Sequence, residues 1–307
     1  ITLDDSGSTI RTSGEGSHAI TIVGDNSEAM LNNLTVSTEG EIASAVLFSS
    51  NAKGTIDGGS YTATGEGSYG VEILNGADLT IKNATITTSG YGMARAIVNR
   101  YATLSLENVN INTTGDFGNA GIYNDGELTG SNVTITTTGS QSFGIQNYTN
   151  TFNLAASHVE TYGEQSVGIM NTGRAELTDT HIVTQGKNAD AISSDGAKST
   201  FVLNNGSTIA SGENSRAVAM THGGALEANS TDITSEQSAA IALESASSAT
   251  VTHSNVSGSN VAFSFSGGKN VATIDGGSIT ATASGGSAFA VDSGSADINV
   301  KNVQTMN

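Results

Sequence analysis

The sequence predicts an all-β chain that folds as a right-handed parallel β-helix, a solenoid of about 12 to 13 coils with three strands per coil. The main observation is a small residue followed by an apolar one, which recurs at a nearly constant spacing of about 25 residues. A fixed period in this range is typical of stacked repeats, each of which buries its apolar face against the next. The apolar members of the pair are Ile20, Val46, Val71, Ile97, Ile122, Ile145, Ile169, Ile192, Val218, Ile241, Phe263 and Val291.

Two further apolar rows keep the same period and mark the second and third strands of each coil. Their β-branched residues alternate with polar ones, which is typical of strands rather than helices. Gly, Asn, Asp and Ser gather between the strands, where turns need them. We therefore expect residues 1–307 to form a single β-helix without a second domain. The second row is Leu31, Ile56, Ile81, Leu106, Leu128, Leu154, Leu177, Leu203, Leu226, Val251, Ile274 and Val300. The third row is Ile10, Val36, Tyr61, Ile86, Ile111, Ile135, Val159, Ile182, Ile209, Ile233, Val256, Ile279 and Val303.

Four asparagines stand two residues after the first-strand row in successive coils: Asn99, Asn124, Asn147 and Asn171. This register predicts that their amides stack inside the solenoid and bond to one another. We interpret them as structural residues rather than as a binding site.

Composition restricts the function. The chain has no cysteine, so disulfides and thiolate metal sites are excluded, and it has no proline to interrupt central strands. Its net charge of −18 disfavours nucleic acid and anionic membranes as partners, because both would need Lys and Arg. The sequence shows no signal peptide and no apolar run long enough to span a membrane.

The repeats at residues 79–90 (LTIKNATITTSG) and 104–115 (LSLENVNINTTG) resemble passenger domains of bacterial autotransporters, and most of all the AIDA-type adhesins. The resemblance covers the whole chain and is one of repeat style. It implies export through the outer membrane, a link to that membrane through a C-terminal β-barrel absent from these residues, and display at the cell surface. It also implies an adhesin that supports aggregation or biofilm, and thereby virulence, with another copy of itself, a host matrix protein or a glycan as partner.

A glycan-active lyase or hydrolase is the alternative, because parallel β-helices also carry such enzymes. Those enzymes need clustered Asp or Glu, usually with Lys, Arg or His. The eleven basic residues are scattered along this sequence. We therefore expect no catalytic residues, no cofactor and no enzymatic activity.

His158 and His181 precede the third-strand row in neighbouring coils, and Glu160 is expected on the same face. Two imidazoles and a carboxylate could hold a divalent metal. An exposed polar pair without a ligand is the simpler interpretation, so no metal site is predicted.

A stripe of aromatic, aliphatic and arginine residues follows the first strands of coils two to seven. Alternation predicts that many of these side chains point outward, and this composition is typical of a contact surface. The alternative is that some of them tuck under a neighbouring loop. The predicted contact residues are Tyr69, Arg95, Val98, Arg100, Tyr101, Tyr123, Phe143 and Met170.

Overall fold

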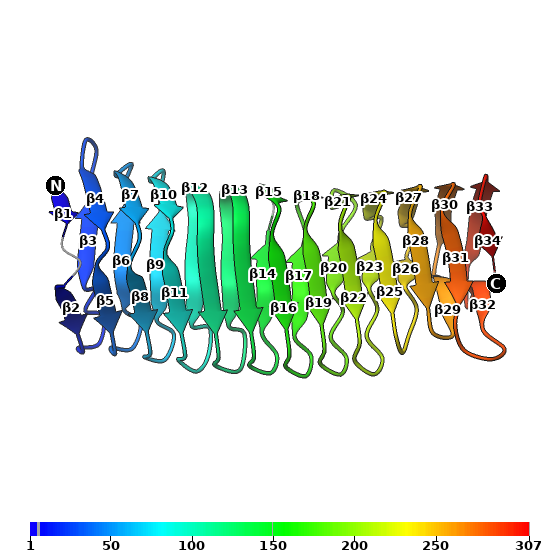
Figure 1. Ribbon diagram of the computed structural model, residues 1–307, viewed down its shortest axis with the longest axis horizontal. Coiled ribbons are helices and arrows are strands. Elements are labelled where there is room, and N and C mark those ends of the chain that lie inside the picture. The colour runs from blue at the N-terminus through cyan, green and yellow to red at the C-terminus, as the bar shows by residue number, and fades with distance from the viewer. Residues whose placement is uncertain (5–6, 149, 307) are drawn as a thin grey trace. The chain divides into compact units, whose positions relative to one another are not determined.

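A computed structural model describes residues 1–4, 7–148 and 150–306 and confirms the right-handed parallel β-helix (Figure 1). Contacts divide the chain into two units. The first consists of Ile1–Gln146 and Asn150–His158, and the second of Asn147–Thr149 and Val159–Asn307. The single-domain interpretation remains a prediction. No helix among the described residues is long and apolar enough to cross a membrane.

Each coil contributes three strands, and each strand pairs in parallel with its equivalent about 25 residues along the chain. The first strands are β3 (Ile20–Val23), β6 (Ser44–Ser49), β9 (Tyr69–Leu74), β14 (Phe143–Asn147), β17 (Val167–Asn171), β20 (Ile192–Asp195), β23 (Val218–Thr221), β26 (Ile241–Glu244), β29 (Val261–Ser266) and β32 (Ser287–Val291). The second strands are β1 (Thr2–Asp4), β4 (Glu28–Asn32), β7 (Lys53–Asp57), β10 (Asp78–Lys82), β15 (Thr151–Ala155), β18 (Arg174–Thr178), β21 (Thr200–Asn204), β24 (Ala225–Asn229), β27 (Ser248–Thr252), β30 (Lys269–Asp275) and β33 (Ser295–Lys301). The third strands are β2 (Thr9–Thr12), β5 (Thr35–Thr38), β8 (Ser60–Ala63), β11 (Thr85–Thr88), β16 (His158–Thr161), β19 (His181–Thr184), β22 (Ser207–Ala210), β25 (Asp232–Ser235), β28 (Asn255–Gly258), β31 (Ser278–Ala281) and β34 (Thr305–Met306). In two coils β12 (Arg95–Thr113) and β13 (Ala120–Thr137) run through all three positions.

The core of each unit is the inside of the coil, and the predicted apolar rows line this core. Two of the residues predicted for the second-strand row lie at a different position. Leu128 pairs with Leu104, and Gly130 takes the place expected for Leu128. Leu226 is displaced in the same way, with Ala228 in its place. The second strand has two inward positions, two residues apart, so alternation alone could not decide which of them a leucine occupies.

Three further row assignments were wrong. Ile182 pairs with Thr208, which is buried, so Ile209 faces outward and is half-buried. In the last coil Phe289 pairs with the row residue Phe263, and Val291 is 51% exposed. In the last third strand Ile279 pairs with Met306, three residues after the predicted row residue Val303. In all three cases an apolar residue near the row also fits the sequence period.

The asparagine ladder is confirmed within each unit. In the first unit the Asn99 amide nitrogen donates to Asn124 Oδ1 at 2.8 Å. In the second unit Asn147 donates to Asn171 Oδ1 at 2.8 Å, and Asn171 donates to Ser194 Oγ at 3.0 Å. All five residues are buried, so these bonds satisfy amide groups that have left water, whereas Asn99 Oδ1 has no hydrogen-bond partner among the described residues.

The turn between the second and third strands is built by asparagines with positive φ. Asn83, Asn108 and Asn132 have φ of 52°, 54° and 53°. Asn132 donates to Asn108 Oδ1 at 2.7 Å, and Asn108 donates to Asn83 Oδ1 at 3.2 Å. Asparagine tolerates the left-handed region, so this row costs little in strain.

In the first unit the turn between the third and first strands opens with glycine. A Cβ on Gly65 would overlap the carbonyl oxygen of Gly40, and one on Gly90 would overlap that of Gly65. Successive coils approach each other too closely here for any other residue. In the first unit these turns connect β5 to β6 and β8 to β9, along the lower edge of the ribbon in Figure 1.

Candidate functional site

The first-strand face consists of the outward residues of β9, β12 and β13, all in the first unit. Arg95 lies opposite Tyr69, Val98 opposite Tyr123, and Arg100 opposite Leu74. Ile97 and Asn99 alternate with them and are buried inside the coil. The register therefore brings the predicted residues of three neighbouring coils to one face.

Two guanidinium groups lie over the ring of Tyr123. Arg95 Cζ is 4.1 Å and Arg100 Cζ 5.2 Å from the ring centroid. The face of an aromatic ring attracts cations at this range, by roughly 0.5–2 kcal/mol per pair. The two interactions concentrate positive charge on a chain whose net charge is −18.

Exposure along this face corrects part of the prediction. Val98 is only 1% exposed and Arg95 only 9%, so neither offers much surface to a partner. Both point away from the coil interior, but Val98 stands between Glu72 and Tyr123 of the adjacent coils, and Arg95 lies against Tyr123. Side chains of adjacent coils therefore cover positions that alternation alone assigned to the surface.

The remaining predicted residues keep some exposed surface. Tyr69, Arg100, Tyr123 and Phe143 are half-buried, and Tyr101 is 65% exposed. Met170, on β17, is also half-buried and belongs to the second unit. The contact role of all these residues stays a prediction.

Tyr101 borders a hollow of about 260 Å³ in the first unit. Asp125 and Glu127 line it from β13, and Asn150 donates its side-chain amide to Asp125 Oδ1 at 3.4 Å. The hollow combines one aromatic ring with two carboxylates, a composition suited to a polar or cationic group.

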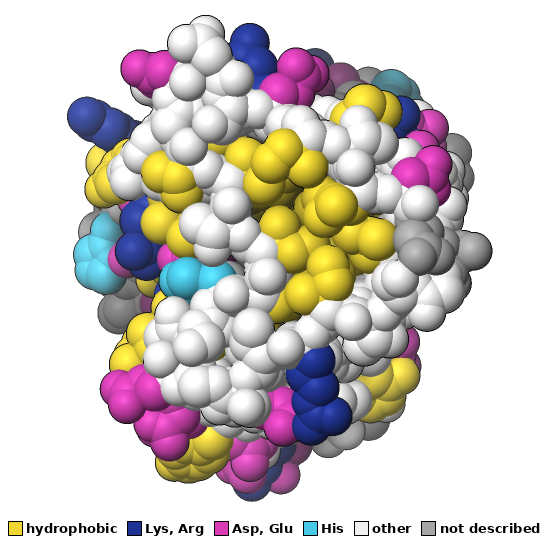
Figure 2. Space-filling model, turned by 90° about the vertical axis from the view of Figure 1, so that its left-hand side faces the viewer, with side chains coloured by type: hydrophobic (Ala, Val, Ile, Leu, Met, Phe, Trp, Pro, Cys, Tyr) yellow, Lys and Arg dark blue, Asp and Glu magenta, His cyan; other side chains and the backbone are white. Residues whose placement is uncertain are grey.

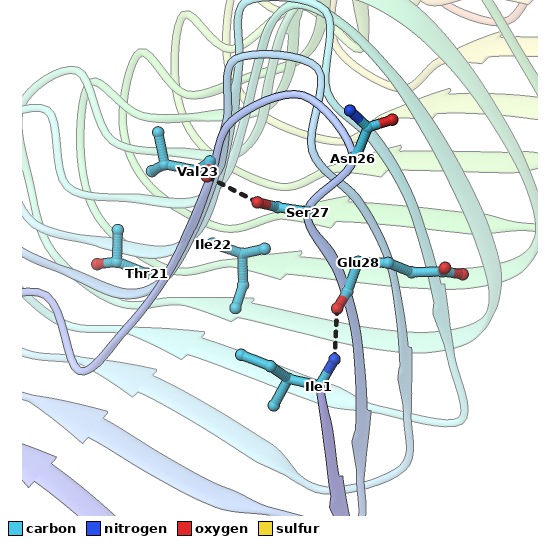
Figure 3. A pocket seen from close by; sticks show the side chains of 7 residues that line it. All are labelled: Ile1, Thr21, Ile22, Val23, Asn26, Ser27 and Glu28. Carbon is cyan, nitrogen blue, oxygen red and sulfur yellow. Dashed lines mark hydrogen bonds between the residues drawn. The ribbon is translucent and has the colours of Figure 1, made fainter.

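A second hollow of about 480 Å³ opens at the first coil of the first unit, where hydrophobic side chains gather in the centre of the view in Figure 2. Figure 3 shows Ile1, Ile22 and Val23 among its lining residues. Ser27 Oγ donates to the Val23 carbonyl at 2.8 Å, and the Ile1 amino group to the Glu28 carbonyl at 2.7 Å. These bonds hold the strands around the hollow, whose lining mixes apolar side chains with polar ones such as Asn26 and Glu28.

The metal candidates already have protein partners. Glu160 Oε1 accepts the Gln185 amide at 2.8 Å, and its hydrogen bond to Tyr162 raises the pKa of that phenol. His181 Nδ1 lies 2.7 Å from Ser207 Oγ. Within residues 1–4, 7–148 and 150–306, no three or more His, Cys, Asp or Glu side chains are grouped to hold a metal ion.

Sequence reasoning missed the most exposed group of large apolar side chains in the first unit. Ile42, Tyr91, Met93 and Phe117 occupy the turns between third and first strands and are 64%, 56%, 60% and 46% exposed. The available signal was a large apolar residue one to three positions after the turn glycine, where neighbouring coils carry glycine or polar residues.

The fold and these surfaces define an extended parallel β-helix unit that presents side chains from successive coils. No protein-family model and no curated protein sequence matches the chain. Among solved structures, it is similar to a chain in the cryo-EM structure of the Vag8–C1 inhibitor complex, with a TM-score of 0.68 and 18% sequence identity. The match covers 98% of this chain and 68% of the other. At this identity the similarity shows the fold alone, a parallel β-helix.

Proposed function

We propose that the chain is part of a non-enzymatic adhesin passenger of a bacterial autotransporter, exported through the outer membrane to the cell surface. It joins neighbouring cells into aggregates and biofilm, or attaches them to host matrix or glycan. The β-helix fold supports this proposal, as does the fact that Vag8 was solved in complex with a protein.

The observation that carries the proposal is the Arg95–Tyr123–Arg100 group beside the exposed Tyr101. Tyrosine and arginine dominate binding hot spots, because they offer large contact areas together with hydrogen bonds. A carboxylate-bearing partner, such as an acidic matrix protein or a sialylated glycan, suits the Arg100 guanidinium group, which keeps some exposed surface.

One group of charged side chains has a structural role, and this supports the proposal that the chain is not an enzyme. In the second unit Arg216 bonds Asp190 Oδ2 at 2.7 Å and Glu244 Oε1 at 2.6 Å, so these carboxylates hold neighbouring coils together. A carboxylate held in this way is an ion-pair partner rather than an acid or base available to substrate.

The test compares cells that display the full passenger with cells that display the variant Arg100→Ala/Tyr101→Ala/Tyr123→Ala. We expect weaker aggregation or weaker binding to matrix proteins or glycans, since each hot-spot truncation costs about 2 kcal/mol or more. Tyr162→Ala is the matched control, because this tyrosine is 43% exposed in the second unit.

Salt separates the two kinds of partner. Self-association between chains of net charge −18 should strengthen as salt screens their repulsion, whereas carboxylate binding to Arg100 should weaken. Equal behaviour of wild type and triple variant in aggregation, matrix and glycan assays would reject the proposed site. Polysaccharide turnover that a single Asp or Glu substitution abolishes would reject the non-enzymatic assignment.

A further inference from the structure

The turn patch consists of Ile42, Tyr91, Met93 and Phe117, and hydrogen bonds between turns join its members. Ile42 N donates to the Glu66 carbonyl at 3.0 Å, and Gly67 N to the Tyr91 carbonyl at 3.1 Å. Met93 N donates to the Phe117 carbonyl at 2.9 Å. The turns of four neighbouring coils therefore carry the patch along the lower edge of the ribbon in Figure 1.

Two of its side chains, Tyr91 and Phe117, contact each other directly. The rings of Tyr91 and Phe117 are 5.2 Å apart between centroids and inclined by 51°. Met93 packs beside Gly118, where a Cβ would lie 3.4 Å from its Cγ. Single exposed apolar residues are normal on protein surfaces, but gathered ones mark binding sites.

The backbone under the patch is strained. Ile42, Met93 and Phe117 have φ of 52°, 57° and 66°, in the left-handed region that glycine favours. For a β-branched residue such as Ile42 this is a true outlier. The neighbouring coils place Gly16 and Gly67 at the position of Ile42, both with positive φ.

Neither the backbone conformation nor burial therefore explains why large apolar residues occupy these turns. A large side chain adds strain in this turn, and it gains no shelter from water because it is largely exposed. The equivalent turns of the second unit carry Gln165, Asn188 and Asn214, which are polar. Strain maintained at a surface position is a property of functional sites.

Acidic side chains border the patch. Glu41 precedes Ile42, Glu66 lies in the turn between Ile42 and Tyr91, and Asp116 precedes Phe117; all three are exposed. No lysine or arginine occurs at residues 40–42, 65–67, 90–93 or 115–118. The surface is therefore apolar and aromatic at its centre and negative at its rim.

We propose that the turn patch binds a protein segment that presents apolar side chains flanked by Lys or Arg. Apolar groups would cover the aromatic centre, and cations would meet the carboxylate rim and the ring faces. A second copy of this chain fits poorly, because it would oppose acidic rim to acidic rim at a net charge of −18 per chain. The proposal does not depend on the first-strand face and stands if the adhesin function fails.

The test uses the full chain and three short synthetic peptides. One has a central Leu-Phe pair flanked on each side by two arginines, the second has glutamate for arginine, and the third has serine for the apolar pair. We expect the first peptide to bind at least about tenfold more tightly than either of the others, and added NaCl to weaken it. Equal binding of the acidic or the serine peptide would overturn the proposal.

Ile42→Gly is the most informative variant, because glycine suits the positive φ. We expect its unfolding temperature to be unchanged or higher while peptide binding weakens by about threefold or more. Tyr91→Ala/Phe117→Ala should weaken binding by about tenfold or more, and the control Tyr162→Ala should not change it. Wild-type affinity in both patch variants would refute the site. Self-association of the chain that both variants abolish would assign the patch to a second copy instead, and so overturn the proposal.

Discussion

Replacing Asn171 with leucine should open the second unit locally, because this amide serves several buried partners at once. Its nitrogen donates to the Gly173 carbonyl and to Ser194 Oγ, each at 3.0 Å. Its oxygen accepts the Gly173 amide at 3.2 Å and the Asn147 amide at 2.8 Å. Leucine can form none of these bonds.

The size of the stability loss follows from the polar groups that lose their hydrogen-bond partner. The Gly173 amide and carbonyl and the Asn147 side chain would each lose a bond inside the coil, at about 1–3 kcal/mol apiece. Burial of the leucine returns about 1.5–3 kcal/mol. The row accepts this shape, since Met220 and Leu243 occupy it in later coils. We expect a net loss of about 3 kcal/mol, mostly from missing hydrogen bonds.

Hydrogen exchange measures this loss locally, which matters because stacked repeats need not unfold in one step. A loss of about 3 kcal/mol predicts that amides of β17 and β20 exchange roughly 100-fold faster in Asn171→Leu. Met220→Leu is the matched control and should cost less than about 1.5 kcal/mol, because it exchanges one apolar residue for another. Unchanged protection in Asn171→Leu, or equal damage from Met220→Leu, would refute this account of the ladder.

Two more predictions concern titratable groups. The Tyr61 hydroxyl is buried without a hydrogen-bond partner in the described part of the chain, and burial raises the pKa of this phenol. Because Tyr61→Phe removes this unpaired hydroxyl, it should raise the free energy of unfolding by about 1 kcal/mol at neutral pH. The gain should grow above pH ~10, where the tyrosine ionises only in the unfolded chain, and denaturation curves that show a loss at both pH values would contradict it. Hydrogen bonds from Thr221 and His222 lower the pKa of Asp195. The Asp195 carboxylate therefore stabilises the fold at pH values above the ordinary Asp pKa of ~3.9, and this stabilisation is lost as the pH falls through the lowered pKa of the folded state. Thr221→Val should raise that pKa in an NMR titration of the Asp195 carboxyl carbon, and an unchanged midpoint would show that the hydroxyl has no such effect.

The fold was predictable because one period runs through three apolar rows. Errors arose where two inward positions competed, as with Leu128 and Gly130, or where a polar residue turned inward, as with Thr208. In each case neighbouring coils impose the register through hydrogen bonds, and a single coil's sequence does not contain that information.

The candidate surface was predictable only in part. Alternation correctly turned Val98 away from the core, but it could not show that side chains of adjacent coils cover it. Tyr101 is exposed, as expected. The turn patch was missed because a turn residue such as Ile42 has no alternation to indicate its direction, and its positive φ appears only in three dimensions.

The parallel hydrogen bonds between coils also determine how each unit responds to tension. These hydrogen bonds run from one coil to the next. The covalent chain, in contrast, connects neighbouring coils at only one turn. A pull that separates coils therefore loads the bonds of one coil at a time. Each released coil of about 25 residues supplies roughly 85 Å of extended chain. Under tension each unit should therefore lengthen in steps of one coil. The coils that have not yet unfolded keep their surfaces.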